Sequence, residues 1–82
     1  MRYVIDIDGT ICSEEGPVEK RTPIPERIRY INKLYDEGHY IVYWTARGLK
    51  SGRGEKYYRP ITEKQLEEFG CKYHELGFKS HD

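Results

Sequence analysis

The sequence predicts an α/β fold: a Rossmann-like, three-layer α/β/α unit with a short parallel sheet in the order β-α-β-α-β. Two short runs, residues 2–8 and 39–44, have the β-branched and aromatic composition of buried strands. Between them, the stretch from Pro25 to Gly38 is apolar at three- and four-residue steps, which is typical of an amphipathic helix. Strands that alternate with helices in this way form parallel sheets with right-handed crossovers.

Local signals give the bounds of the first half of the chain. Residues 9–25 are rich in Gly, Pro, Glu and Lys, so we expect a polar loop that leaves the core. Pro25 fits the first turn of the helix and Gly38 its end. The run 39–44 lacks alternation, so we expect both of its faces to be buried.

The second half of the chain is predicted in the same way. Residues 48–60 contain three glycines and four Lys or Arg residues before Pro60, and they are expected to form a loop. The sequence from Thr62 to Gln65 matches a capping box, which predicts that a short second helix starts there and ends at Gly70. A weak third strand is expected over 71–76.

Length and charge restrict the classes of function. Residues 1–82 are expected to form one domain, and the 14 basic and 14 acidic side chains leave no net charge. The chain therefore offers no basic field for nucleic acid. Its N-terminal apolar run is interrupted by Asp6 and Asp8 and is too short for a signal peptide or membrane span, so we expect a cytoplasmic protein with no membrane partner. Cys12 and Cys71 are expected to be reduced thiols, and Cys12 is not expected to be a nucleophile.

Polar residues follow the predicted strands where ligands bind in open α/β sheets. They are Asp6 and Asp8, Thr45, and Lys79. Two carboxylates in one site favour a hard cation such as Mg²⁺ over a pair of solvated turn residues. Gly9 allows a sharp turn that frees backbone amide groups to face an anion.

The stretch Asp6-Ile7-Asp8-Gly9-Thr10 resembles the first motif of the haloacid dehalogenase superfamily of phosphatases. The run IVYWTAR, which contains Thr45, is similar to the second motif of that family, and Lys79 is similar to the third. The stretch from Thr45 to Lys79 also resembles a small capless subgroup associated with capsule and surface-sugar biosynthesis.

The resemblance implies a Mg²⁺-dependent phosphomonoesterase that acts through an aspartyl-phosphate on a small phosphorylated metabolite, most simply a sugar phosphate. Asp6 would be the nucleophile and Asp8 the general acid/base, and both would contribute to the metal site. The phosphate group would be bound by Gly9, Thr10, Thr45, Ala46, Arg47 and Lys79. From the residues alone, Arg47 is either a phosphate ligand or a solvated loop arginine.

The fourth motif of the family, a pair of acidic residues, is expected about nine residues after the lysine. The sequence has three residues after Lys79, and we do not assign the metal-ligand role to Asp82. Two alternatives to the enzyme therefore stay open: a catalytically inactive phosphate-binding or regulatory module, and a structural interaction domain. In this family a further strand, which carries the fourth motif, pairs with the first one. Without it, strand 2–8 is expected to be an edge that either a second copy of the chain or a rearranged C-terminal tail covers. We expect a homo-oligomer with residues 2–8 at or near the contact.

Other residues give weaker signals. Tyr57 and Tyr58 are candidates for stacking on a sugar ring, with core or rim packing as the alternative. His39, His74 and His81 have no metal-ligand spacing. The glycines at 48, 52 and 54 match neither a Walker nor a dinucleotide motif, which excludes nucleotide binding of that type.

Overall fold

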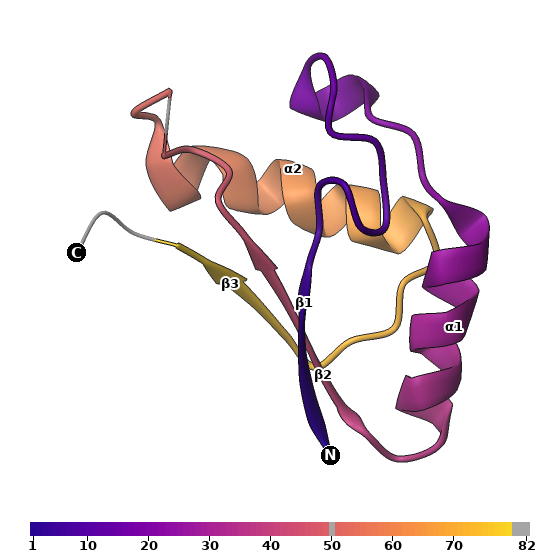
Figure 1. The fold of residues 1–82 in the computed structure, drawn as a ribbon. Helices are drawn as coiled ribbons and strands as arrows, with labels where there is room; N and C mark the ends of the chain where they lie inside the picture. The colour runs from indigo at the N-terminus through magenta and orange to yellow at the C-terminus, as the bar shows by residue number, and fades with distance from the viewer. Residues whose placement is uncertain (50, 80–82) are drawn as a thin grey trace.

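Three parallel strands and two α-helices form the part of the chain that the computed structural model describes, residues 1–49 and 51–79. In chain order the elements are β1 (Arg2–Asp6), a 3₁₀ turn η1 (Val18–Lys20), α1 (Pro25–Asp36), β2 (Tyr40–Thr45), α2 (Gly54–Glu68) and β3 (Glu75–Phe78). The strands lie in the order β1-β2-β3, so β2 is central (Figure 1). The α/β class and the β-α-β-α-β order are confirmed.

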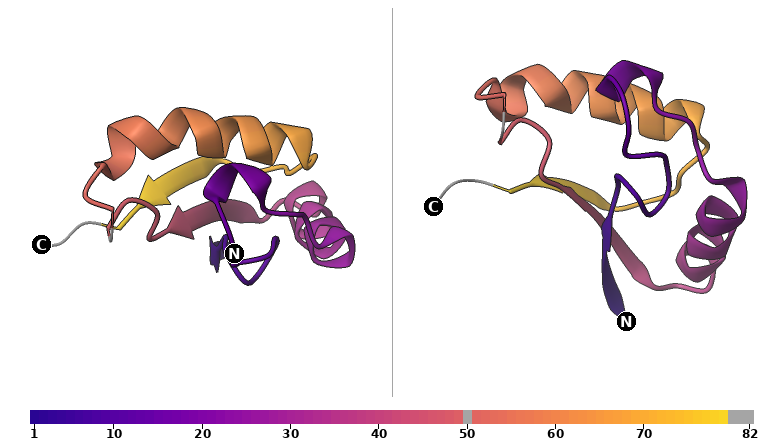
Figure 2. Two further views of the ribbon diagram at one scale, coloured as in Figure 1. Left: turned by 90° about the horizontal axis from the view of Figure 1, so that it is seen from above. Right: turned by 45° about the horizontal axis from the view of Figure 1, so that its top comes forward.

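Both helices cover the same face of the sheet. Tyr3 and Ile5 of β1 are in register with Ile41 and Tyr43 of β2, and these side chains belong to one core together with Leu66 of α2. Ile28 and Ile31 bring α1 into that same core. Two successive right-handed crossovers in one direction place both helices on one side. The described residues thus form two of the three expected layers (Figure 2).

The opposite face of the sheet is open to solvent within the described part of the chain. Val4 is 54% exposed, Tyr40 39% and Trp44 37%. Val42, between them, is buried at 3%. The expectation that the second strand is buried on both faces therefore holds at its centre and fails at Tyr40 and Trp44, because no described helix packs on that side.

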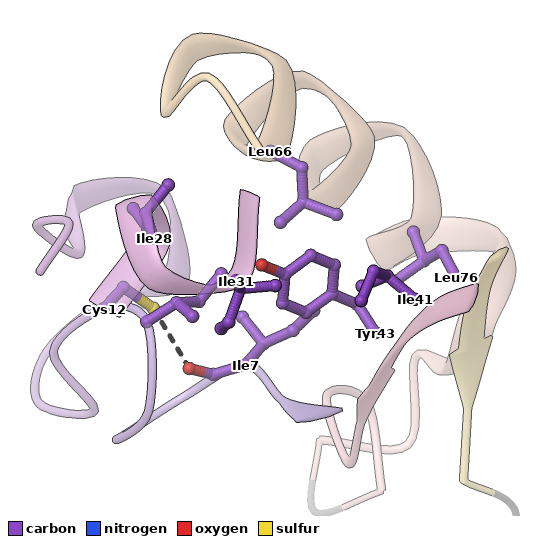
Figure 3. Close-up of a cluster of buried hydrophobic side chains, with 9 residues drawn as sticks. Ile7, Cys12, Ile28, Ile31, Ile41, Tyr43, Leu66 and Leu76 are labelled. Carbon is purple, nitrogen blue, oxygen red and sulfur yellow. Dashed lines mark hydrogen bonds between the residues drawn. The ribbon is translucent and has the colours of Figure 1, made fainter. Parts of the chain in front are cut away.

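Tyr43 lies at the centre of the core. Its ring is fully buried, and Leu66 of α2 and Ile31 of α1 point toward it from the helical layer (Figure 3). Ile7 and Cys12, from the chain just after β1, close the same cluster, and the Cys12 thiol lies 3.8 Å from the carbonyl of Ile7. The core thereby fixes the segment that follows the first strand.

The second helix is longer than the sequence predicts. It begins at Gly54 and contains Pro60, so the expected loop over 48–60 is wrong from residue 54 onward. Pro60 has no backbone N–H to donate to the carbonyl of Lys56, four residues earlier in the helix. Both residues are exposed, so water can bind this carbonyl and the helix tolerates the proline. Thr62 and Gln65 consequently lie inside the helix and are buried there, and they do not form a capping box at its start.

The third strand begins later than expected, at Glu75. Pairing with β2 starts where the backbone N–H of His74 donates to Ile41 (2.9 Å), because residues 71–73 are still crossing from α2 to the sheet. Of the described helices, none is long and apolar enough to cross a membrane.

Candidate functional site

The carboxyl ends of β1 and β2 border one crevice of about 500 Å³. The charged and aromatic side chains that line it are Asp6, Asp8, Glu14, Arg21, Arg47 and Tyr58. Ala46, Gly48 and Leu49 form part of its wall from the chain that follows β2. Of the residues expected at the site, the structure brings Asp6, Asp8, Ala46 and Arg47 together here.

The turn after β1 is held by its own backbone. Gly9 has a positive φ of 83°, and its N–H donates to the carbonyl of Cys12 (2.9 Å). The N–H groups of Thr10 and Ile11 donate to Ile7 at 3.1 and 3.0 Å. The amides of Gly9 and Thr10 are therefore used within the turn, and the Thr10 side chain lines a different groove, beside α1.

Asp8 is bound by two arginines. Arg47 donates to both of its carboxylate oxygens, Nε to Oδ2 at 3.1 Å and Nη2 to Oδ1 at 2.8 Å. Arg21 contributes a third contact, from Nη1 to Oδ1 at 2.8 Å. The fork of the guanidinium suits a bidentate pair of this kind.

The structure answers the question left open for Arg47. Its side chain is 2% exposed, which excludes a solvated loop arginine. Its Nη1 donates to the Thr62 hydroxyl at 2.9 Å and to the Gln65 side-chain oxygen at 2.8 Å, both on α2. These two helix residues hold the guanidinium toward Asp8.

This environment keeps Asp8 ionised. Burial alone would raise the pKa of its carboxyl, but hydrogen bonds and charge from Arg47 and Arg21 outweigh burial and lower the pKa below its usual value of 3.8. Cys12, whose thiol lies 3.5 Å from Asp8 Oδ1, shows the opposite effect. Burial, followed by the charge and hydrogen bond of Asp8, raises the pKa of Cys12 to about 11, so this thiol stays protonated.

Asp6 differs from Asp8 in having no ion-pair partner among the described residues. It is exposed, and its Oδ1 accepts a hydrogen bond from the N–H of Ile7 at 3.0 Å. A free carboxylate at a strand end can act as a nucleophile or as a cation ligand. Asp6 has the accessibility that either role requires.

Among the carboxylates of the crevice, Asp6 is suited to bind Mg²⁺. Within the described part of the chain, no group of three or more His, Cys, Asp or Glu residues could hold a metal ion. Mg²⁺ is often bound through one or two carboxylates, with water and substrate phosphate as the other ligands. Asp6 fits that arrangement, whereas the side chain of Asp8 is occupied by arginine. Asp82 and His81 lie outside the described residues.

Thr45 and Lys79 lie next to the crevice and do not line it. Thr45 is fully buried, and its hydroxyl accepts the N–H of Arg47 at 3.2 Å. The N–H of Lys79 donates to the carbonyl of Thr45 (2.9 Å), which places Lys79 at the end of β3. Its exposed side chain lines an adjoining pocket of about 240 Å³ that shares Arg47, Gly48 and Leu49 with the crevice.

Two charged residues that line the crevice, Arg21 and Glu14, were not expected from the sequence. Both belong to the loop 9–25, which folds back on itself through backbone bonds between Ser13 and Thr22 (2.9 Å) and between Ile24 and Ile11 (2.7 Å). Nothing in the spacing of the loop predicts that fold. The one available signal is that Lys20 and Arg21 are two adjacent bases in a loop that begins at an acidic motif.

Tyr57 and Tyr58 have separate environments. Tyr58 lines the crevice, while Tyr57 is 42% exposed and lies under the guanidinium of Arg53, 4.5 Å from the ring centre. The two rings meet edge to face at 4.9 Å. Of the pair, Tyr58 can contact a molecule bound in the crevice.

No family model and no curated protein sequence matches the chain. Three solved structures resemble it. A structural-genomics target from Vibrio cholerae is 22% identical, with a TM-score of 0.83 over 94% of this chain and 68% of that one. The Pnkp1/Rnl/Hen1 complex is 21% identical, with a TM-score of 0.75 over 96% of this chain and 28% of that one.

The third is D,D-heptose 1,7-bisphosphate phosphatase from B. bronchiseptica, in complex with magnesium and phosphate. It is 16% identical, with a TM-score of 0.67 over 99% of this chain and 50% of that one. Identities this low establish the fold and nothing finer. The chain shares an α/β, Rossmann-like fold with these three structures.

Proposed function

We propose that this protein is a Mg²⁺-dependent phosphomonoesterase that acts through an aspartyl-phosphate on a small phosphorylated metabolite. The observation that carries the proposal is the contrast between the two carboxylates of one crevice. Asp6 is exposed and unpaired, as a nucleophile must be, and Asp8 is held in place by Arg21 and Arg47. The resemblance of the first motif to phosphatases of this fold supports the same assignment.

In the first half of the reaction, a carboxylate oxygen of Asp6 attacks phosphorus. The bond from phosphorus to the ester oxygen breaks, and that oxygen leaves as the alcohol after taking a proton. In the second half, water attacks the aspartyl-phosphate, which releases inorganic phosphate and regenerates the carboxylate. Asp8 is the general acid in the first half and the general base in the second.

The two arginines have different roles in this scheme. Arg47 is 2% exposed and tied to α2, so it stays with Asp8 as a positioning residue. Arg21 is 16% exposed and is attached to the loop only through the carbonyl of Gly16, so it can turn toward a phosphate. A phosphate dianion that draws Arg21 away also raises the proton affinity of Asp8 through like-charge repulsion. Asp8 would then carry the proton that the leaving oxygen needs.

Asp6 and the backbone carbonyl of Asp8 would hold Mg²⁺, which would supply positive charge to a phosphate oxygen when bound. Lys79 adds a second cation from the adjoining pocket. The sugar-phosphate class is supported by Tyr58, whose ring lines the crevice, and by the heptose phosphate substrate in the name of one similar structure.

The assignment of Asp6 is tested by hydrolysis of p-nitrophenyl phosphate with and without Mg²⁺. Asp6→Asn should abolish turnover while circular dichroism remains that of the parent. Asp36→Asn is the matched control, because Asp36 is an exposed aspartate on α1 that pairs only with Lys72, and this variant should keep the parent rate. An Asp6→Asn protein that retains most of the activity overturns the nucleophile assignment.

A second candidate function is a phosphate-binding or regulatory module without turnover. It is favoured by the two arginines that neutralise Asp8, and by the lack of a three-residue metal cluster within residues 1–49 and 51–79. Such a module binds inorganic phosphate or vanadate but hydrolyses no ester at any Mg²⁺ concentration. Phosphate affinity that falls in Arg21→Ala, without turnover in the parent, identifies this alternative.

A further inference from the structure

We propose that a second copy of this chain pairs with the outer edge of β1, antiparallel and in one specific register centred on Val4. Within the described part of the chain, β1 pairs with β2 on one side and with no strand on the other. An open edge of this kind presents unpaired backbone groups that can pair with another strand.

The backbone geometry fixes which residues face outward. The N–H of Tyr40 donates to the carbonyl of Met1 (2.8 Å), so Met1 directs its backbone toward β2. In a parallel pair, alternate residues direct their backbone groups to opposite sides of the strand. Tyr3 and Ile5 therefore also face β2, and the N–H and C=O groups of Arg2, Val4 and Asp6 point away from the sheet.

Exposed apolar side chains lie on both faces beside this edge, and on the open face Arg2 and Asp6 flank them. Val4, in the middle of the strand, is 54% exposed on the open face of the sheet. On the helical face, a groove of about 350 Å³ runs between β1 and α1, and it is lined by Tyr3, Ile5, Tyr30 and Leu34 among others. Tyr30 is 66% exposed at the rim of the groove. A strand added at this edge would cover apolar surface on both faces.

The strand is complementary to itself. In an antiparallel pair related by a two-fold axis at Val4, Val4 lies opposite the partner's Val4, and Tyr3 lies opposite the partner's Ile5. Arg2 then lies opposite the partner's Asp6, and the symmetry repeats that charge pair at the other end. Outward-facing residues meet outward-facing residues in this register, so the ladder of hydrogen bonds can form.

Other registers lack this match. A shift that places Arg2 opposite the partner's Val4, or Val4 opposite the partner's Asp6, leaves charges against an apolar side chain. A parallel arrangement sets like charges beside each other and is not closed by a two-fold axis. Neither Arg2 nor Asp6 takes part in an ion pair within the described residues, so both are free to pair across the edge. Opposite charges directly across antiparallel strands stabilise the pair.

The interface does not rest on the phosphatase proposal, because mass alone tests it. In this register the partner's Arg2 pairs with Asp6, so the dimer would hold the proposed nucleophile in an ion pair and the monomer would be the form with a free Asp6. Sedimentation of the full chain in EDTA, from low micromolar to millimolar concentration, should approach twice the monomer mass of 9.8 kDa. Arg2→Asp and Asp6→Arg should each return the protein to monomer, because like charges then face each other. The double variant Arg2→Asp/Asp6→Arg should restore the dimer.

The control is Arg29→Asp, which makes the same change of charge on an exposed residue of α1 and should leave the dimer intact. Circular dichroism establishes that each variant is folded. A second measurement is independent of charge: Val4→Cys should form a covalent dimer on mild oxidation, because directly opposite Cα atoms in such a pair are about 5.5 Å apart. Arg29→Cys should not form one.

Three results overturn the proposal. The first is a monomer at every concentration with no cross-link in Val4→Cys. The second is a dimer that neither single charge variant weakens. The third is a pair of weakened single variants that the double variant does not rescue, which would mean that the occupant of this edge is not a second copy in this register.

Discussion

The guanidinium of Arg47 holds the carboxylate of Asp8 through two hydrogen bonds, at 3.1 and 2.8 Å, although 39 residues separate them in the sequence. The pair joins the turn after β1 to the turn after β2. Because α2 holds the other side of the same guanidinium, three segments of the fold meet at one side chain. Stability and site geometry are therefore linked in this protein.

We expect Arg47→Lys to lower the free energy of unfolding by about 2–4 kcal/mol. A lysine cannot make the bidentate contact, and it leaves hydrogen-bonding groups of Thr62 and Gln65 without their partner. Urea denaturation of the variant measures this loss. Arg29→Lys, on the exposed side of α1, is the control and should change the free energy by less than about 0.5 kcal/mol. Equal stability of the parent and Arg47→Lys would show that the contact with Asp8 is replaceable.

Stability should also fall on acidification. The pKa of Asp8 is lowered in the folded protein, since burial is outweighed by Arg47 and Arg21. A lowered folded-state pKa gives stability that is fully present above the unfolded-state value and is lost as pH falls through the folded-state value. The urea midpoint, measured in EDTA from pH 7 downward, should therefore decrease below about pH 4. In Asp8→Asn this acid-dependent decrease should be smaller, because the titrating group is gone.

Some of the site could be predicted from the sequence and some could not, and the difference has a physical cause. Asp6, Asp8 and Thr45 could be placed at strand ends because apolar β-branched runs precede them. The contacts of Arg47 with α2 could not be predicted, because they require that Thr62 and Gln65 lie on the face of that helix that points to the site. The glycines and Pro60 indicate a loop over residues 48–60, but the folded chain is helical from Gly54 onward. The sequence therefore does not show where the helix begins or which of its residues share a face.

The same contrast holds for the layers of the fold. The order of strands and helices follows from periodicity, and it is confirmed. The direction of successive crossovers decides which face of the sheet each helix covers. This direction is a property of the whole strand order, so no single segment of the sequence predicts it. Because both helices lie on one face, the side chains of Val4 and Trp44 on the other face are exposed.

Tyr43→Phe is expected to leave the protein as stable as the parent or to raise its free energy of unfolding by about 1 kcal/mol. The Tyr43 hydroxyl is buried, and the polar group beside it is the thiol of Cys71, which forms only weak hydrogen bonds. Removing the hydroxyl therefore removes a desolvation penalty that this contact offsets little. Thermal unfolding is a direct measurement. Tyr30→Phe, at a residue that is 66% exposed, serves as control and should have little effect. A loss of 1 kcal/mol or more in Tyr43→Phe would show that the hydroxyl has a partner in solution.

The open face of the sheet contains one tight contact, between Gly77 of β3 and the ring of Trp44 on β2. These residues are directly paired in the parallel register. A Cβ atom at Gly77 would collide with the ring carbons Cε3 and Cζ3 of Trp44, so the ring occupies the space that a side chain at position 77 would need. We expect Gly77→Ala to lower the free energy of unfolding by about 1–3 kcal/mol, because the ring must move or the strands must separate.

The Trp44→Ala background tests this cause, since the added methyl group then meets no ring. There Gly77→Ala should cost little or even stabilise, because alanine loses less backbone entropy than glycine in a strand. If the two substitutions instead add independently in urea denaturation, glycine is needed at position 77 for its backbone and not for the approach of Trp44.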